Sequence, residues 1–210
     1  ATLPPECRLL MPPAGVLQWA ASKRRQLALA SRVGFGVLPT FFLESAGDCA
    51  LLPSDAFPVV LRPECRPMGT PSFKISVACS EWELQDIFDA FGASCGTLIA
   101  QPLQSLPNLV VHGARTTGGE LTAMRAFLVP RKFRGITLTI TPARFPPGLD
   151  RCCRDFITEA GITGCFHFEL LFDPHRNRTW FLEVNVRLGG TTDKVAALGY
   201  DEGRFLLEAY

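Results

Sequence analysis

The sequence predicts an α+β fold with largely antiparallel sheets. The first observation is that 47% of the 210 residues are hydrophobic, which is enough to bury a substantial core. The second is that short β-rich runs follow one another with turn signals between them, which is typical of antiparallel strands. The third is that helices are interposed only occasionally, whereas a parallel α/β fold would place one after every strand.

In the first half of the chain, two helices are expected. Residues 18–33 are rich in Ala, Leu, Arg, Lys and Gln, which favour a single helix, and Gly34 follows as a left-handed cap. Ser80 and Glu83 have the spacing of a capping box, and the apolar residues after them recur with helical period. Short apolar runs predict strands at residues 40–43, 57–62 and 96–101.

In the second half, β-rich runs are more frequent. Helical periodicity predicts a helix over residues 149–160, capped by Gly161, and a helical tail from Thr192 to the end. Gly118 and Gly119 have the composition of a hairpin tip. The strands are expected at residues 108–115, 121–129, 135–141, 164–172 and 179–186.

Composition excludes several classes of function. With 21 basic and 20 acidic side chains the net charge is +1, so no field attracts nucleic acid. The apolar runs fall short of the ~20 residues of a spanning helix and no export signal is visible, so we expect a cytoplasmic protein that does not enter a membrane. The eight cysteines form no C-x-x-C pair and only three histidines are present, so we expect reduced thiols and no zinc site.

The segment 164–190 carries the most informative pattern. Side chains on a strand alternate between two faces, so Glu169 and His167 point away from the apolar face of the first strand. On the second strand, the same alternation predicts one face that carries Phe181, Glu183, Asn185 and Arg187.

A five-residue turn would set the register of this hairpin. If Asp173 lies opposite Thr179, antiparallel pairing places Glu169 opposite Glu183, with Cβ atoms ~4.5–5.5 Å apart. Two carboxylates so close, if shielded from water, must share a proton or bind a cation. Asn185 adds a neutral oxygen donor, and hard oxygen donors of this kind suit magnesium.

Exposure of the two glutamates on an open sheet face is the alternative explanation. A binding site is favoured by the alternate Glu, Asn and Arg residues beside Gly189 and Gly190, which open a helix whose N-terminal end attracts anions. Arg187 continues the row and could grip a phosphate or carboxylate with two hydrogen bonds.

These residues resemble the metal-binding end of the ATP-grasp superfamily. The resemblance consists of a glutamate in an apolar strand, a short hairpin and then Glu-x-Asn-x-Arg. The four matching residues are Glu169, Glu183, Asn185 and Arg187. Weaker matches occur at residues 22–23, 34–39, 57–63 and 97–103. Residues 187–190 and 199–201 most resemble the carboxylate-amine ligase branch.

The resemblance implies two α+β lobes that clamp ATP. The implied domains are an N-terminal segment with a linker helix (1–56), a small lobe (57–101) and a large lobe with the metal site (102–210). The implied magnesium ligands are Glu169, Glu183 and Asn185. The implied ATP contacts are Lys23 and Arg62 for phosphates and the hinge residues Ala100, Gln101 and Leu103 for adenine.

The implied activity is ATP- and magnesium-dependent amide formation. In this chemistry a carboxylate attacks the γ-phosphate to give an acyl phosphate, which an amine then captures. Arg187 would be the catalytic residue that stabilises the oxyanion. The implied partners are ATP and a small carboxylate and amine, of undetermined identity. A homodimer is left open. We also expect a longer natural protein, because the family has a preceding domain and the final helical pattern continues to the last residue.

The sequence departs from the family pattern at three points. Arg62 stands where a lysine is usual, residues 64–70 contain one glycine where several are usual, and Pro102 removes a hinge N–H, which leaves Leu103 as the adenine contact. Arg62 and the glycine-poor loop favour the alternative of a catalytically degenerate ATP-grasp module that binds a nucleotide or regulates. A third hypothesis is a non-nucleotide α+β protein whose glutamates bind calcium structurally.

Single residues also have simpler explanations. Lys23 would be a solvated helix lysine if the family pattern did not hold. Arg62 ends an apolar strand, and Glu64 is a candidate partner for its buried charge. His167 shares the face of Glu169, and we expect a hydrogen-bonded wall residue rather than a base.

Overall fold

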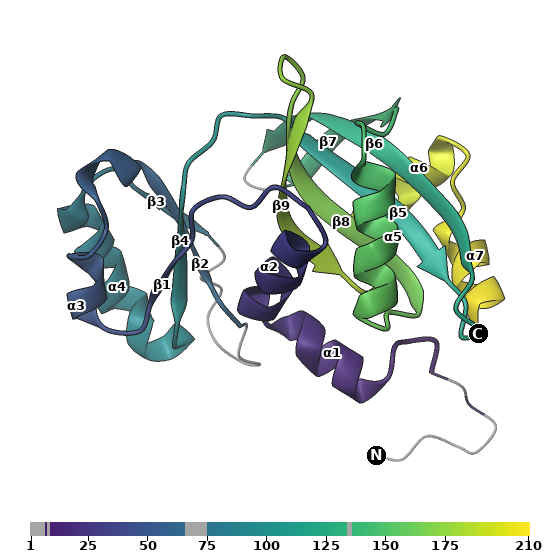
Figure 1. The fold of residues 1–210 in the computed structure, drawn as a ribbon, viewed down its shortest axis with the longest axis horizontal. Coiled ribbons are helices and arrows are strands. Elements are labelled where there is room, and N and C mark those ends of the chain that lie inside the picture. The colour runs from purple at the N-terminus through teal and green to yellow at the C-terminus, as the bar shows by residue number, and fades with distance from the viewer. Residues whose placement is uncertain (1–6, 8, 66–74, 134–135) are drawn as a thin grey trace.

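The computed structural model describes residues 7, 9–65, 75–133 and 136–210. It contains a four-stranded and a five-stranded sheet, and all pairs of neighbouring strands in them are antiparallel (Figure 1). The predicted α+β fold with largely antiparallel sheets is confirmed.

The four-stranded sheet forms the small lobe, on the left of Figure 1. In spatial order its strands are β1 (Phe41–Leu43), β4 (Leu98–Pro102), β2 (Val59–Pro63) and β3 (Ser76–Ala78). The other elements of this lobe are α3 (Ala46–Cys49), η1 (Ser54–Ala56) and α4 (Glu81–Cys95). Val59 and Leu61 alternate along β2 and are fully buried, in one apolar cluster with Leu84 of α4.

The five-stranded sheet forms the large lobe. In spatial order its strands are β7 (Ile136–Ala143), β6 (Leu121–Phe133), β5 (Asn108–Arg115), β8 (Gly164–Asp173) and β9 (Arg178–Asn185). Helices α2 (Lys23–Arg32) and α5 (Leu149–Glu159) cover one face, and α6 (Thr192–Ala197) and α7 (Glu202–Ala209) cover part of the other (Figure 1).

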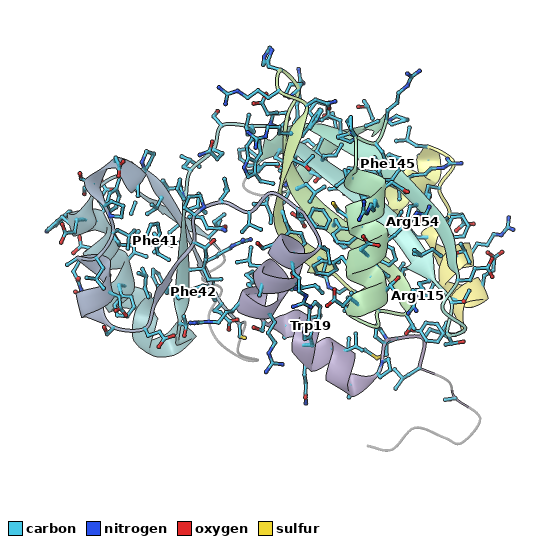
Figure 2. The ribbon with its side chains drawn as sticks, in the orientation of Figure 1. Trp19, Phe41, Phe42, Arg115, Phe145 and Arg154 are labelled. Carbon is cyan, nitrogen blue, oxygen red and sulfur yellow. The ribbon has the colours of Figure 1, made fainter. Side chains whose placement is uncertain are left out.

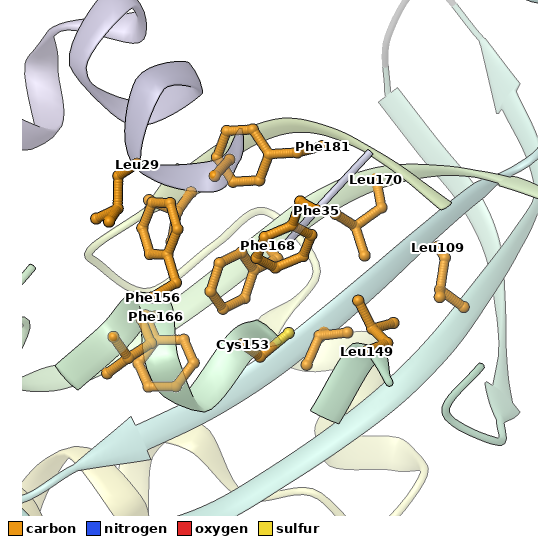
Figure 3. Packing of buried hydrophobic residues seen from close by; sticks show 14 of the residues in the cluster. Leu29, Phe35, Leu109, Leu149, Cys153, Phe156, Phe166, Phe168, Leu170 and Phe181 are labelled. Atoms are coloured by element: carbon orange, nitrogen blue, oxygen red, sulfur yellow. The ribbon is translucent and has the colours of Figure 1, made fainter. Parts of the chain in front are cut away.

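Aromatic side chains fill the core between the five-stranded sheet and its helices (Figure 3). Phe156 of α5 packs against Phe168 and Phe181, with ring centroids 5.3 Å apart in both pairs. Trp19 of α1 (Ala14–Ala21), labelled in Figure 2, packs edge-on against the same Phe156. This core therefore connects the helices before the small lobe to the sheet of the large lobe.

The single helix predicted over residues 18–33 is wrong, because the chain breaks at Ser22 between α1 and α2. Ser22 has extended φ/ψ angles, and its hydroxyl accepts a hydrogen bond from the Arg25 N–H. Serine is a favoured N-cap because it satisfies one of the free N–H groups at a helix start. The break makes Lys23 the first residue of α2.

In the 164–190 hairpin the predicted strand register is wrong beside the turn, but the predicted pairing of Glu169 with Glu183 is confirmed. Asp173 pairs with Arg178 rather than Thr179, and a β-bulge at Leu182 then restores the pairing of Glu169 with Glu183. A bulge adds one residue and moves subsequent side chains to the other face. Phe181, predicted on the polar face, is therefore buried in the core.

Two further helical predictions need correction. The tail after Thr192 forms two helices rather than one, because the chain turns through Gly199, which has a φ of +80°. At α4, the Ser80 hydroxyl accepts from the Glu83 N–H as predicted, but the Glu83 carboxylate accepts from the Cys79 N–H instead of closing the box on Ser80.

β1 pairs with β4 and therefore belongs to the sheet of the small lobe, which changes the predicted boundary between the N-terminal segment and that lobe. Residues 41–56, assigned to the linker, supply this edge strand together with α3 and η1. We therefore propose that the small lobe begins at Phe41 and extends to the end of β4, because Pro102, predicted as the first residue of the large lobe, pairs with Val59 in the four-stranded sheet. Of the helices that the structure describes, none has the length and apolar character needed to cross a membrane.

Candidate functional site

Three charged side chains from distant parts of the chain meet where the two lobes face each other. Lys23 Nζ of α2 lies 3.6 Å from Glu183 Oε2 of β9, and Arg62 Nη1 of β2 lies 3.9 Å from the same oxygen. All three side chains are largely but incompletely buried. We call Lys23, Arg62 and Glu183 the Glu183 cluster. All three are among the residues that the sequence predicts for the site.

The cluster keeps its carboxylate ionised. Burial by itself would raise the pKa of Glu183, but Lys23, Arg62 and a hydrogen bond from Asn185 outweigh it, so the pKa lies below its usual value. Burial lowers the pKa of Arg62, against the opposing effects of Glu183 and Glu169. Both ion pairs are longer than a direct hydrogen bond, so phosphate or a cation could exchange for these partners with little structural change.

Arg62 is oriented from both lobes. Its Nη2 donates to Gln101 Oε1 at 2.9 Å and to the Leu182 carbonyl oxygen at 3.0 Å. Gln101 is buried, and its Nε2 donates in turn to Thr40 Oγ1 at 2.8 Å. Leu182 is the extra residue of the β-bulge, so the irregularity that restores the Glu169–Glu183 pairing also supplies an acceptor for Arg62.

Lys23 is positioned through Gln26, one turn along α2. The Gln26 side chain accepts from the Val184 N–H at 2.8 Å and donates to the Val184 carbonyl oxygen at 3.2 Å. Val184 follows Glu183 directly, so these two buried bonds fix α2 against the strand that carries the carboxylate. Sequence reasoning missed Gln26, although a glutamine beside Leu27 on the apolar face of a helix was the available signal.

Glu64, the alternative partner considered for Arg62, pairs with other groups. The Glu64 carboxylate caps α2, where it accepts from the Arg24 N–H at 3.0 Å and from the Ser22 hydroxyl. Its carbonyl oxygen also accepts from the Lys23 N–H at 3.3 Å. A carboxylate at the start of a helix satisfies free N–H groups and favours the helix dipole. Glu64 therefore joins β2 of the small lobe to α2.

The predicted metal ligands share one face of the β8–β9 pair. Glu169 is the register partner of Glu183, and Asn185 Nδ2 donates to Glu183 Oε1 at 3.3 Å. Glu169 Oε2 lies 3.8 Å from Lys132 Nζ of β6. Among the described residues there is no group of three or more His, Cys, Asp or Glu side chains arranged as a metal site. The donor set of two carboxylates and one amide fits an ion that takes its remaining ligands from water and phosphate, as magnesium does.

The proposed adenine contacts differ in how available they are. Ala100 is buried in the middle of the four-stranded sheet, paired with Phe41 on one side and Leu61 on the other. The Leu103 N–H, predicted to contact adenine, donates instead to the Pro58 carbonyl oxygen at 2.8 Å. An adenine contact through this N–H would require that bond to break. Of the predicted phosphate loop 64–70, residues 66–70 lie outside the described residues.

Arg187 lies beyond the end of β9 and is exposed. Its Nη1 donates to the Leu188 carbonyl oxygen at 3.0 Å. Arg187 also borders a groove that continues away from the Glu183 cluster. The predicted catalytic arginine therefore stands at the same end of the sheet as Glu183 and Asn185, without a fixed acidic partner in the described part of the chain.

A buried histidine cluster, which sequence reasoning missed, lies next to this site. His112 Nδ1 of β5 lies 2.6 Å from Glu202 Oε1 of α7, and its Nε2 lies 3.1 Å from Thr191 Oγ1. The ring of His167 stacks on His112 with centroids 5.3 Å apart. We call His112, His167, Thr191 and Glu202 the His112 cluster. It anchors α6 and α7 to the sheet.

His167 was predicted to be a hydrogen-bonded wall residue, and this is only half right. It is 95% buried, as its 5% exposure shows, yet its Nδ1 has no hydrogen-bond partner among the described residues. Burial, helped by neighbouring His112, lowers the pKa of His167 to about 4. His167 is therefore neutral near pH 7, and it is the register partner of Asn185.

Several solved structures are similar to this chain over most of its length. The biotin carboxylase domain of Hydrogenobacter thermophilus 2-oxoglutarate carboxylase has a TM-score of 0.77 at 16% identity, over 95% of this chain and 47% of that one. Campylobacter jejuni biotin carboxylase has a TM-score of 0.77 at 20% identity, over 96% and 49%. N5-carboxyaminoimidazole ribonucleotide synthetase from Thermus thermophilus has a TM-score of 0.73 at 17% identity, over 89% and 50%.

The chain has the ATP-grasp fold. It spans about half of the length of each of these three neighbours. The Hydrogenobacter domain was solved with magnesium ADP, ADP and bicarbonate, and the Campylobacter enzyme with a β,γ-ATP compound. No protein-family model and no curated protein matches the sequence. At such low identity the likeness concerns the ATP-grasp fold, and the chemistry must be argued from this chain's own residues.

Proposed function

We propose that the chain is the ATP- and magnesium-dependent part of a carboxylate-amine ligase. The observation that carries the proposal is the Glu183 cluster: an ionised carboxylate flanked by two cations from different elements, with Glu169 opposite and Asn185 beside it. A purely structural ion pair would not need a second carboxylate across the strand, because like charges placed opposite each other are destabilising.

In this proposal the roles follow from charge and position. Lys23 and Arg62 would contact phosphate oxygens, because both cations lie at the junction of the lobes and are held there by neighbouring hydrogen bonds. Glu169, Glu183 and Asn185 would hold magnesium, which supplies charge neutralisation of the phosphates when bound. Gln26 and Gln101 are positioning residues for the two cations.

The proposed reaction has two balanced steps. An oxygen of the substrate carboxylate bonds to the γ-phosphorus, and the bond to the bridging oxygen breaks with its electron pair leaving on ADP. The amine nitrogen then bonds to the acyl carbon, the acyl–oxygen bond breaks, phosphate leaves, and the nitrogen loses a proton to water. Arg187 would stabilise the negative oxygen that forms in the second step.

The second candidate is a degenerate ATP-grasp module that binds nucleotide without turnover. Two observations favour it. Arg62 already donates to Gln101 and Leu182, and the Leu103 N–H is already bonded to Pro58. Release of inorganic phosphate on addition of a panel of acids and amines to Mg-ATP would support the ligase, whereas nucleotide binding without any release would support the degenerate module.

Thermal unfolding tests the shared premise of both candidates. A ligand that binds only the native state raises Tm, so we expect a shift with Mg-ATP and a much smaller one with ATP and EDTA. Glu183→Gln should remove the metal-dependent part, while Glu120→Gln, at an exposed hairpin turn of the same lobe, should retain it. Equal melting curves for the wild type with and without Mg-ATP would refute the proposal.

A further inference from the structure

We propose that the groove beside Arg187 binds the carboxylate substrate and that this substrate is an acid with one carboxylate and an apolar body. The groove has a volume of about 530 Å³ and begins at Asn185 and Arg187. Its other walls come from residues 10–12, from α1 and from α7. This inference rests on the proposed function, because it assigns to the groove the acid that the ligase would activate.

The groove lies at the end of the β8–β9 pair. Val184 and Val186 line it from the core side, and Cys165 and Asn185 line it from the sheet face that carries Glu183. Along β8 that face carries Glu169, then His167, then Cys165, with neighbours ~6.6 Å apart. Glu183 lies opposite Glu169 and Asn185 opposite His167, but β9 ends there, so Cys165 has no partner in β9 and lines the groove.

Asn185 connects the two halves of the site. Its side chain donates to Glu183, and the residue also lines the groove. A carboxylate held between Asn185 and Arg187 would therefore lie beside the position proposed for magnesium and the phosphates. The body of the acid would extend the other way, past Cys165 towards α7.

The charge of the groove fits a single carboxylate. Arg187 is the one charged side chain among the described residues that line it, and none of those residues is acidic. A guanidinium group has five N–H donors, and the one hydrogen bond that the structure records for Arg187 goes to the Leu188 carbonyl oxygen. A planar guanidinium with free donors matches a carboxylate in two parallel hydrogen bonds.

The remaining walls fit an apolar body. Leu10, Leu17 and Leu206 converge on the groove from three segments, while Ala20 on α1 leaves room that a larger residue would fill. The volume lies within the range of small-molecule sites, which are mostly apolar with a few polar groups that fix orientation. A second anionic group on the ligand would find no cation in the described walls, so the geometry disfavours diacids and phosphorylated acids.

Binding of simple probe acids by calorimetry, in the presence of Mg-ADP, tests the charge half of this inference. The probes are hexanoate, 4-methylpentanoate and 3-phenylpropionate, compared with 3-phenylpropionamide and succinate. We expect at least one apolar monoacid to bind at least about tenfold more tightly than the amide and succinate. Arg187→Gln should bring that acid to the level of its amide. Equal affinity of acid and amide for the wild type would overturn the inference.

A matched pair on α7 tests the position. Leu206 lines the groove, whereas Leu207, the next residue, is 69% exposed and lies outside its walls. Leu206→Trp should weaken binding of the acid at least about tenfold by filling the groove, and Leu207→Trp should leave it unchanged. A retained Mg-ATP shift in Leu206→Trp would show that the lobe remains folded. Undiminished acid binding in that variant would overturn the inference.

The two levels of the proposal fail separately. If Mg-ATP raises Tm but no apolar monoacid binds, the groove assignment is refuted and the nucleotide site stands. If a monoacid binds with the predicted dependence on Arg187 and Leu206 while Mg-ATP has no effect on Tm, the groove assignment stands as a binding site and the ligase function is refuted.

Discussion

The Glu183 cluster and the His112 cluster meet on one face of the five-stranded sheet, where the register pair Glu169–Glu183 lies next to the pair His167–Asn185. The two clusters are nevertheless built differently. The His112–Glu202 contact is 2.6 Å long between fully buried side chains, and both ring nitrogens have partners. In the Glu183 cluster the ion pairs are 3.6 and 3.9 Å long and partly exposed to water. The short, satisfied contact is suited to fixing helices, and the long, open one is suited to exchanging partners with a ligand.

Breaking the His112 cluster should produce the largest loss of stability. His112→Ala removes the partner of the buried Glu202 Oε1 and leaves the carboxylate only the Thr192 hydroxyl, and loss of one partner of a buried pair costs about 3–5 kcal/mol. The free energy of unfolding from urea titration measures this loss. His175→Ala, in the exposed β8–β9 turn, is the control and should cost far less. Equal losses in both variants would contradict the assignment of His112 as the anchor of α6 and α7.

Removing Gln26 should have the next largest effect, and it should act on both stability and nucleotide binding. Gln26→Ala leaves the Val184 N–H and carbonyl groups without their side-chain partner, at a cost of about 2–4 kcal/mol. The same variant should weaken the Mg-ATP shift, because Lys23 is no longer held beside Glu183. Gln104→Ala, at an exposed position between β4 and β5, should change neither quantity.

The pH dependence of stability should reveal His167, which lies between the two clusters. Its folded pKa of about 4 is below the unfolded value of 6.5, so below pH 6.5 the unfolded chain takes up a proton that the native state does not. The free energy of unfolding is therefore independent of the protonation of His167 above pH 6.5. It decreases as pH falls from 6.5 towards 4, by about 2 kcal/mol between pH 6.5 and 5.

This prediction is tested by the slope of the unfolding free energy against pH, with a second histidine variant as the control. Urea titrations of His167→Asn should show a flatter dependence over pH 6.5 to 5, and His175→Asn should keep the wild-type slope. The carboxylates that face His167, Glu183 and Glu202, have lowered pKa values, so their contributions are lost only below about pH 4.5. An unchanged slope in His167→Asn would assign the effect to another group.

Glu183→Gln should have the smallest effect on stability and the largest on ligand response. Because its ion pairs are long and glutamine keeps the shape of the side chain, the change should cost less unfolding free energy than His112→Ala or Gln26→Ala. The metal-dependent Mg-ATP shift should nevertheless disappear. A loss of several kcal/mol in the absence of ligand would mean that the Glu183 cluster is structural, like its neighbour.

Sequence reasoning located much of the site because the residues concerned are local in sequence or lie on one strand. The strand alternation placed Glu183 and Asn185 on a common face, and the structure retains that face with Glu169 opposite. Phe181 went to the wrong face because a bulge is an irregularity that no alternation rule contains. Glu64 was a candidate partner for Arg62 because the two are close in sequence, but its carboxylate contacts the start of α2, 42 residues away, which closeness in sequence does not reveal.

Local chemistry was enough to determine the α+β class, most strand positions and the row of polar groups at the end of β9. Only the tertiary structure decided that Lys23, Arg62 and Glu183 meet, that Gln26 and Gln101 position the two cations, and that His112 anchors α7. These contacts join residues separated by 39 positions (Arg62 and Gln101) to 160 positions (Lys23 and Glu183). Propensity and periodicity report on neighbours along the chain, whereas packing of helices on a sheet selects which distant side chains share a space.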